Sequence, residues 1–168
     1  MMKALVVYES MYGNTAAVGE AIATSLRTGG LDVDAGPISR ITPADAAGVD
    51  LLVVGGPTHA HGMSRPGTRE TAAGDKDNTF ADPTVAPGLR KWMDELPPGT
   101  ERRAAAFDTR IDKPILLTGS AAKGIAKRLE RHGSPGGEAG VLPRLDEEPA
   151  ARGRDRPRQN MGSRPGPA

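Results

Sequence analysis

The chain has 168 residues, a length that suits one domain of ordinary size. Its 22 Lys and Arg residues nearly balance its 21 Asp and Glu residues, so the net charge of +1 gives no general attraction for nucleic acid or for an anionic membrane surface. The absence of cysteine excludes disulfide scaffolds, thiolate metal sites and thiol catalysis, and no apolar run has the length of a membrane span or a signal peptide. We therefore expect a cytoplasmic protein that binds neither nucleic acid nor a membrane.

Short apolar runs alternate with stretches of helical periodicity over residues 3–133. Strands are expected at 4–8, 31–35, 51–54 and 103–107, and helices at 14–28, 87–96 and 120–133, with a short turn of helix after Thr42. The runs at 4–8 and 51–54 are continuously apolar and predict central strands, whereas 31–35 alternates and predicts an edge strand. Residues 58–85 show no clear periodicity and are expected to form a long functional loop. The order predicts an α/β fold with a doubly wound parallel sheet.

The last 35 residues differ in composition from the rest of the chain. Residues 134–168 contain six Gly, six Pro and six Arg, and their large apolar residues are only Val141, Leu142, Leu145 and Met161. So few apolar side chains cannot offset the entropy cost of ordering the segment. We expect a folded domain at 1–133 and a disordered tail at 134–168, in which residues 140–142 form at best a token edge strand.

The segment that follows the first predicted strand has the composition of a phosphate site. Residues 9–15 read Glu-Ser-Met-Tyr-Gly-Asn-Thr and lead directly into a helix, whose free backbone N–H groups and positive dipole end favour an anion. The segment has no Lys or Arg, which separates it from a Walker loop, and it lacks the three spaced glycines of a dinucleotide fingerprint. The alternative is that Ser10 and Asn14 only cap the helix.

Residues 8–15 resemble the phosphate loop of flavodoxins, and two further segments resemble flavodoxin loops that lie beside the flavin ring. One is Gly55–His59 after the third strand, and the other is residues 107–109 after the fourth. The resemblance implies a flavodoxin-like fold with strand order 2-1-3-4-5 and bound FMN, which a redox partner protein would reduce or oxidise. It implies that the phosphate and ring are held by Ser10, Met11, Tyr12, Gly13, Asn14, Thr15, Pro57, Thr58, His59, Phe107, Asp108 and Thr109.

Three departures from the flavodoxin pattern are visible. Gly19 stands where flavodoxins usually have an alanine that packs the helix on the sheet, and the chain has only five aromatic residues, so His59 is the nearest candidate to cover the ring. The fifth strand and last helix expected after Gly133 are missing or degraded. The Arg-, Gly- and Pro-rich ending suggests a shifted reading frame, which translation of the coding DNA in the other two frames would test.

Two other functions remain open, and a metal site is not expected. Tyr12 is also similar to the loop of flavodoxin-like quinone reductases, which implies an NAD(P)H-dependent enzyme as an alternative to an electron carrier. The scarcity of aromatic residues is compatible with a flavin-free interaction or regulatory domain. A metal site would need His59 and His61 together with Asp75, Asp77 or His132, and we expect none because zinc requires four ligands in a defined geometry.

Overall fold

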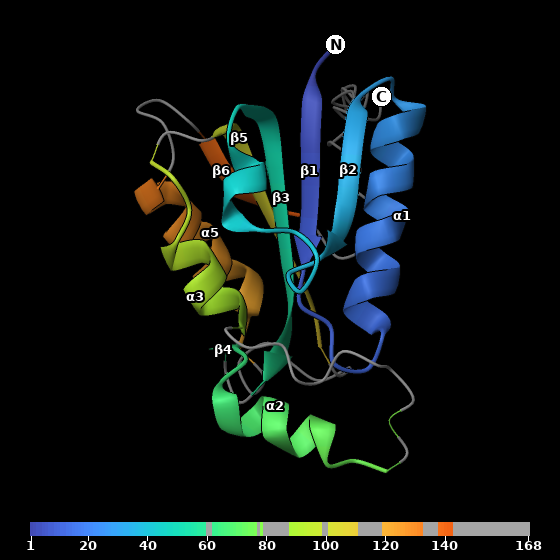
Figure 1. Cartoon of the computed structure of the whole chain (residues 1–168), viewed down its shortest axis with the longest axis vertical. Helices are drawn as coiled ribbons and strands as arrows, with labels where there is room; N and C mark the ends of the chain where they lie inside the picture. Colours follow the sequence, from blue (N-terminus) through green and yellow to red (C-terminus); the bar gives the residue numbers. More distant parts are fainter. Residues whose placement is uncertain are drawn as a thin grey trace, which may run out of the picture.

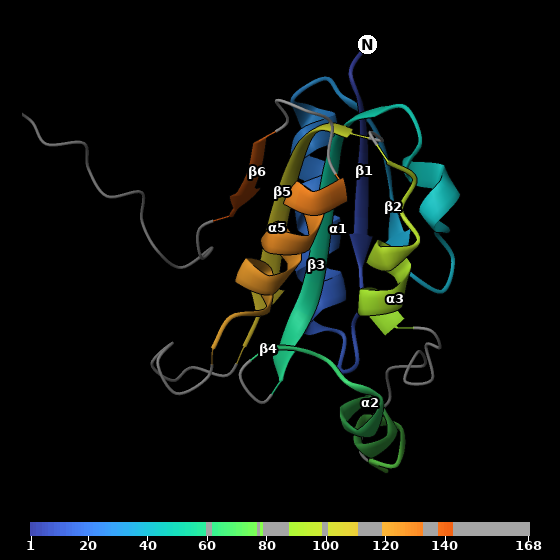
Figure 2. The ribbon, with the colours of Figure 1, turned by 90° about the vertical axis from the view of Figure 1, so that its left-hand side faces the viewer.

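A computed structural model describes residues 1–59, 62–76, 78, 88–98, 101–110, 119–132 and 138–142. These residues form a parallel sheet with helices on both faces (Figures 1 and 2). The elements are β1 (Lys3–Tyr8), α1 (Asn14–Thr28), β2 (Asp32–Pro37), the 3₁₀ turn η1 (Pro43–Ala46), β3 (Val49–His59), β4 (Gly62–Met63), α2 (Pro66–Ala73), α3 (Gly88–Asp94), β5 (Glu101–Thr109), α5 (Ala121–His132) and β6 (Glu138–Val141).

The strand order along the sheet is β2-β1-β3-β5-β6, and all four pairings are parallel. This is the doubly wound order 2-1-3-4-5 that the sequence predicts, with β4 added as a short antiparallel partner of β3. The apolar strands β1 and β3 lie in the middle, where helices cover both faces, and the alternating strand β2 lies at one edge. The predicted fold class is therefore confirmed.

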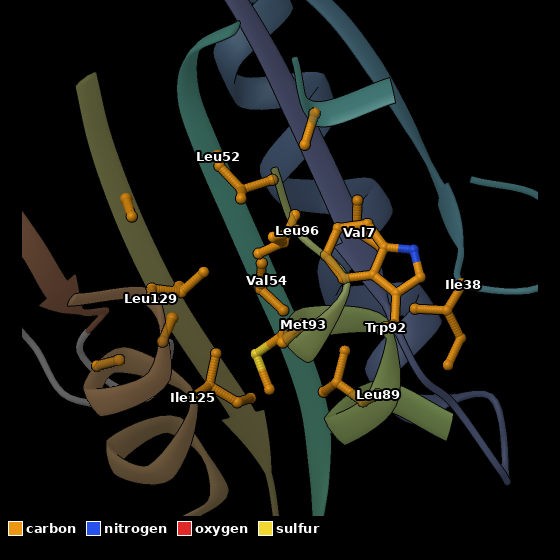
Figure 3. Close-up of a cluster of buried hydrophobic side chains, with 14 of the residues drawn as sticks. Val7, Ile38, Leu52, Val54, Leu89, Trp92, Met93, Leu96, Ile125 and Leu129 are labelled. Carbon is orange, nitrogen blue, oxygen red and sulfur yellow. The ribbon is translucent and has the colours of Figure 1, made fainter. Parts of the chain in front are cut away.

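Two groups of buried side chains hold the helices against the sheet. One lies between the sheet and α3 and α5, and Figure 3 shows Met93 of α3 beside Val54 of β3, and Trp92 beside Val7 and Ile38. Trp92 is 2% exposed, and its indole N–H donates a hydrogen bond of 2.7 Å to the carbonyl oxygen of Ile41. Its polar group is thus satisfied, and Trp92 has the core role that its helical spacing predicts.

The second group lies between the sheet and α1, and it explains Gly19. Tyr8 is 5% exposed, and its hydroxyl donates a hydrogen bond of 2.8 Å to Glu20 Oε1. A Cβ atom on Gly19 would lie 2.5 Å from Tyr8 Cδ1, so the glycine makes room for a ring that is tied at its far end. An alanine at this position, as in the flavodoxin pattern, is incompatible with the present position of Tyr8.

Residues 58–85, expected to be a long loop, contain regular structure where they are described. Strand β3 continues to His59 because Gly56 and Pro57 still pair with β5. Helix α2 begins at Pro66, and the backbone N–H of Arg65 donates to Thr68 Oγ1 at 2.9 Å. The sequence shows no helical periodicity here because α2 buries little, and Ala72 is its one buried residue.

A short fifth strand is present. Residues of β6 pair in parallel with Arg103–Ala106 of β5, and the N–H of Leu142 donates to the Ala106 carbonyl oxygen at 2.8 Å. The expectation of disorder from residue 134 is therefore wrong for 138–142, because backbone pairing to an open strand edge needs no apolar burial. Val141 is 48% exposed, which fits a degraded edge strand. The expected last helix and residues 143–168 lie outside the described residues.

Candidate functional site

The carboxyl ends of the three central strands lie side by side. Tyr8 pairs with Gly55, and Gly55 pairs with Phe107, so the three strands lie in register at the end of β1, and β3 and β5 continue a few residues beyond it. The N–H of Glu9 continues the pairing with a hydrogen bond of 3.0 Å to the carbonyl oxygen of Gly55. The segments that follow β1, β3 and β5 therefore meet at one edge of the sheet, where α2 also lies (Figure 1). Ligands of doubly wound sheets bind at this edge.

The segment after β1 enters α1 without a side-chain cap. Gly13 occupies the position before the helix with φ of 85°, in the left-handed region that favours glycine, and it has no side chain to bond the first-turn N–H groups. The first turn has no acidic residue. Of the two predicted capping residues, Ser10 and Asn14, Asn14 is the one that is exposed to solvent.

Ser10 has a buried hydroxyl that is free to bond a ligand. Its residue is 3% exposed, and its Oγ atom is buried without a hydrogen-bond partner among the described residues. A buried hydroxyl left unpaired costs about 1–3 kcal/mol. Ser10 does not cap α1, so the interpretation that it is only a helix cap is wrong, and its donor remains available beside the uncapped helix start.

Threonine side chains join the three segments. Thr15 Oγ1 lies 2.7 Å from Thr109 Oγ1, which links the start of α1 to the end of β5. Thr58 Oγ1 donates to Asp108 Oδ2 at 3.0 Å, which links the end of β3 to β5. Four residues predicted from separate parts of the sequence are thus brought together, and they hold one another in place.

Asp108 and Thr58 also hold the start of α5. Asp108 Oδ2 accepts hydrogen bonds from Ser120 Oγ at 2.7 Å and from the N–H of Ala122 at 2.9 Å. Thr58 Oγ1 accepts the N–H of Ala121 at 2.9 Å. Thr58 and Asp108, both predicted to lie beside a flavin ring, therefore cap the start of α5 with their side chains. These hydrogen bonds hold in place the edge of the sheet on which a ligand would lie.

Phe107 and Met11 do not present their side chains at this edge. Phe107 is 4% exposed and packs in the core on the α1 side, and Gly55 has no Cβ because one would overlap its ring. Met11 is 2% exposed. The Phe107 side chain therefore faces away from the predicted ring position, because alternation along β5 turns it towards α1. Only the backbone of these two residues remains for ligand contact.

Among the predicted site residues, Tyr12 has an exposed side chain, and Pro57 and His59 are half-buried. Tyr12 is 48% exposed, and desolvation, followed by the charge and hydrogen bond of Asp75, raises its pKa. His59 is half-buried at the end of β3, where burial lowers its pKa and the carboxylate of Glu9 opposes that change. His59 is therefore largely neutral at pH 7 and could lie against a ring without adding a charge.

The chain was compared with known proteins. No protein-family model and no curated protein matches the sequence. Solved structures do match. A flavodoxin from the domain Archaea is 23% identical in sequence and has a TM-score of 0.57, and the alignment covers 86% of this chain and 87% of the archaeal chain. The flavodoxin of Streptococcus pneumoniae TIGR4 matches at 18% identity and 0.59, with 87% of each chain covered. Flavodoxin 1 of Bacillus cereus matches at 17% identity and a TM-score of 0.56, and the alignment covers 86% of this chain and 87% of the Bacillus chain. The chain has the flavodoxin fold.

Within this flavodoxin fold, two residues that were not predicted as site residues support the edge. Glu9 is 1% exposed; its Oε2 accepts the N–H of Leu89 at 2.7 Å, and its Oε1 is buried without a partner among the described residues. Asn78 Nδ2 donates to the carbonyl oxygens of Met11 at 2.8 Å and Ala72 at 3.1 Å. An acidic residue directly after a buried strand is a signal for Glu9, whereas nothing local in the sequence marks Asn78.

The described part of this flavodoxin fold contains neither a cluster of three potential metal ligands nor a helix suited to crossing a membrane. Of the residues named for a metal site, His59, Asp75 and His132 are described, while His61 and Asp77 lie outside the described residues.

Proposed function

We propose that this protein binds FMN without a covalent bond and carries electrons to or from a redox partner protein. The observation that carries the proposal is the uncapped start of α1 beside the buried, unpartnered hydroxyl of Ser10. A phosphate group placed there would accept hydrogen bonds from Ser10 and from backbone N–H groups at Gly13, Asn14 and Thr15. The flavodoxins with similar structures support the same ligand.

The phosphate half of the site fits FMN better than the ring half. The segment 9–15 has no basic residue, so neutral donors would hold the phosphate, as the resemblance implies. At the ring, FMN would supply the redox chemistry, and the protein would set its access and potential. Tyr12 and His59 are the side chains that could cover the ring, since Phe107 lies in the core. We therefore expect weaker binding than in a flavodoxin whose ring lies between two aromatic side chains.

Calorimetric titration with FMN and with riboflavin tests the proposal. Because the phosphate is the predicted anchor, FMN should bind at least ~10-fold more tightly than riboflavin. Ser10→Ala should weaken FMN binding by about 10-fold or more, the effect of one hydrogen bond to a charged group, and leave riboflavin unchanged. Ser25→Ala is the matched control, because Ser25 is exposed on α1 and bonds only the Ala21 carbonyl oxygen within the helix. Absence of heat on FMN addition to the folded protein would refute the proposal.

The burial of Phe107 favours a second candidate, a flavin-free interaction domain that retains the fold. The same titration separates the two, because such a domain would bind neither FMN nor riboflavin. If FMN binds, steady oxidation of NADPH in the presence of a quinone would indicate a reductase, and no oxidation without an added reductase protein would indicate an electron carrier.

A further inference from the structure

Arg110 follows β5 at the carboxyl edge of the sheet and has not been assigned a role. Its side chain is 14% exposed, and its Nε atom is buried without a hydrogen-bond partner in the described parts of the chain. Its Nη1 atom forms a long ion pair with Asp108 Oδ1 at 4.0 Å, a separation too great for a hydrogen bond. Arg110 is therefore a mostly buried cation with an incomplete set of partners.

Asp108 is not free to move towards Arg110. Its Oδ2 atom accepts hydrogen bonds from Thr58, Ser120 and Ala122, which hold the carboxylate in place at the start of α5. Burial of a charge is costly unless the charge is paired and hydrogen-bonded. The guanidinium thus retains capacity to bond an anionic group that is not part of the described chain.

The position of Arg110 indicates which part of a ligand it would face. Side chains alternate along β5: Thr109 turns towards Thr15 and the start of α1, whereas Asp108 turns towards Thr58 and α5. The proximity of Arg110 to Asp108 places it on the Asp108 side. It therefore lies with the segments expected to flank the flavin ring, away from the predicted phosphate donors.

We propose that Arg110 raises the reduction potential of the bound flavin by pairing with the negative charge of its reduced ring. This inference rests on the proposed FMN binding. A bound flavin would carry one more negative charge on its ring after uptake of two electrons and one proton than in its oxidised form. A cation held nearby in a partly desolvated site stabilises the reduced form and not the oxidised form, so the potential rises.

The test compares the wild type with Arg110→Gln, which removes the charge, and Arg110→Lys, which keeps it. Arg103→Gln is the matched control, because Arg103 is exposed on the same strand and pairs with Leu51, far from the carboxyl edge. Each protein is titrated with FMN and riboflavin, and the potential of bound FMN is measured against a dye of known potential during reduction with dithionite. Circular dichroism verifies the fold of each variant.

Arg110→Gln should lose about 10-fold of the preference for reduced over oxidised FMN, which equals about 30 mV for a two-electron couple. Arg110→Lys should retain most of that preference, and Arg103→Gln should match the wild type. An unchanged potential in Arg110→Gln would overturn the inference, as would a loss of FMN affinity without loss of riboflavin affinity, which would assign Arg110 to the phosphate.

Binding of FMN to the wild type separates this inference from the proposed function. Failure of the wild type to bind FMN would refute the proposed function itself, whereas FMN binding with the same potential in the wild type and in Arg110→Gln would refute only the role of Arg110.

Discussion

Replacement of Gly19 by alanine should destabilise the protein, although alanine is the better helix former. Alanine in a helix interior is favoured over glycine by about 1 kcal/mol. The new methyl carbon, however, would lie 2.5 Å from Tyr8 Cδ1 and 2.9 Å from Cε1, closer than carbon atoms approach in folded proteins. The ring cannot easily withdraw, because its hydroxyl is bonded to Glu20.

The size of the effect follows from the two opposing contributions. Overpacking of a core position costs about 1–3 kcal/mol. Set against the helix gain, it leaves Gly19→Ala less stable by about 1 kcal/mol in urea unfolding of the apo protein. Gly124→Ala is the control, since it lies inside α5 and its methyl would meet only the flexible end of Met63, at 3.4 Å. That variant should be more stable than the wild type by up to about 1 kcal/mol.

A double-mutant cycle assigns the effect to the ring. Tyr8→Leu is destabilising by itself, but in that background Gly19→Ala should become stabilising by up to about 1 kcal/mol, because the ring it would strike is gone. The coupling free energy between the two sites should then be about 2 kcal/mol. If Gly19→Ala stabilises the protein with Tyr8 intact, the argument from close packing is refuted.

Other consequences concern the cap of α5 and two titrating residues. Asp108→Ala should lower the free energy of unfolding by about 2–4 kcal/mol in urea titration, because it leaves three partly buried donors without their shared acceptor. Asp94→Ala, which breaks an exposed ion pair, should change it by less than about 1 kcal/mol. Burial, and then the hydrogen-bonded Glu20, raise the pKa of Tyr8 to about 12. The contribution of the neutral Tyr8 phenol to the free energy of unfolding should therefore be complete below pH 10 and decline as the pH rises towards 12. Spectrophotometric titration of the phenol checks the pKa, and Tyr8→Phe should abolish that part of the decline. Burial lowers the pKa of His59, so the unfolded chain binds more protons than the folded protein below pH 6.5. The contribution of neutral His59 to the free energy of unfolding is therefore lost as the pH falls. The NMR signals of the His59 ring should titrate below pH 6.5, and His59→Gln should flatten the acid side of the stability curve.

The sequence alone determined the order of the strands and the segments that meet at the ligand edge. The apolar runs that became β1 and β3 need cover on both faces, and this requires a parallel sheet with crossover helices. In such a sheet every segment after a central strand reaches the same edge. Ser10, Thr15, Thr58 and Asp108 could therefore be expected at one edge from the one-dimensional pattern. The strand register brings the segments after β1, β3 and β5 to that edge, and hydrogen bonds join Thr15 to Thr109 and Thr58 to Asp108.

Only the tertiary structure decided which of these side chains are available to a ligand. Phe107 lies in the core because Gly55 on the neighbouring strand leaves room for its ring, and no local pattern reports a contact between residues so far apart. Asp108 accepts a hydrogen bond from Ser120, 12 residues later and just before α5, and Arg110 keeps an unpaired buried Nε. Helical and strand periodicity depend on near neighbours, whereas cross-strand packing and charge pairing depend on distances that the fold alone sets.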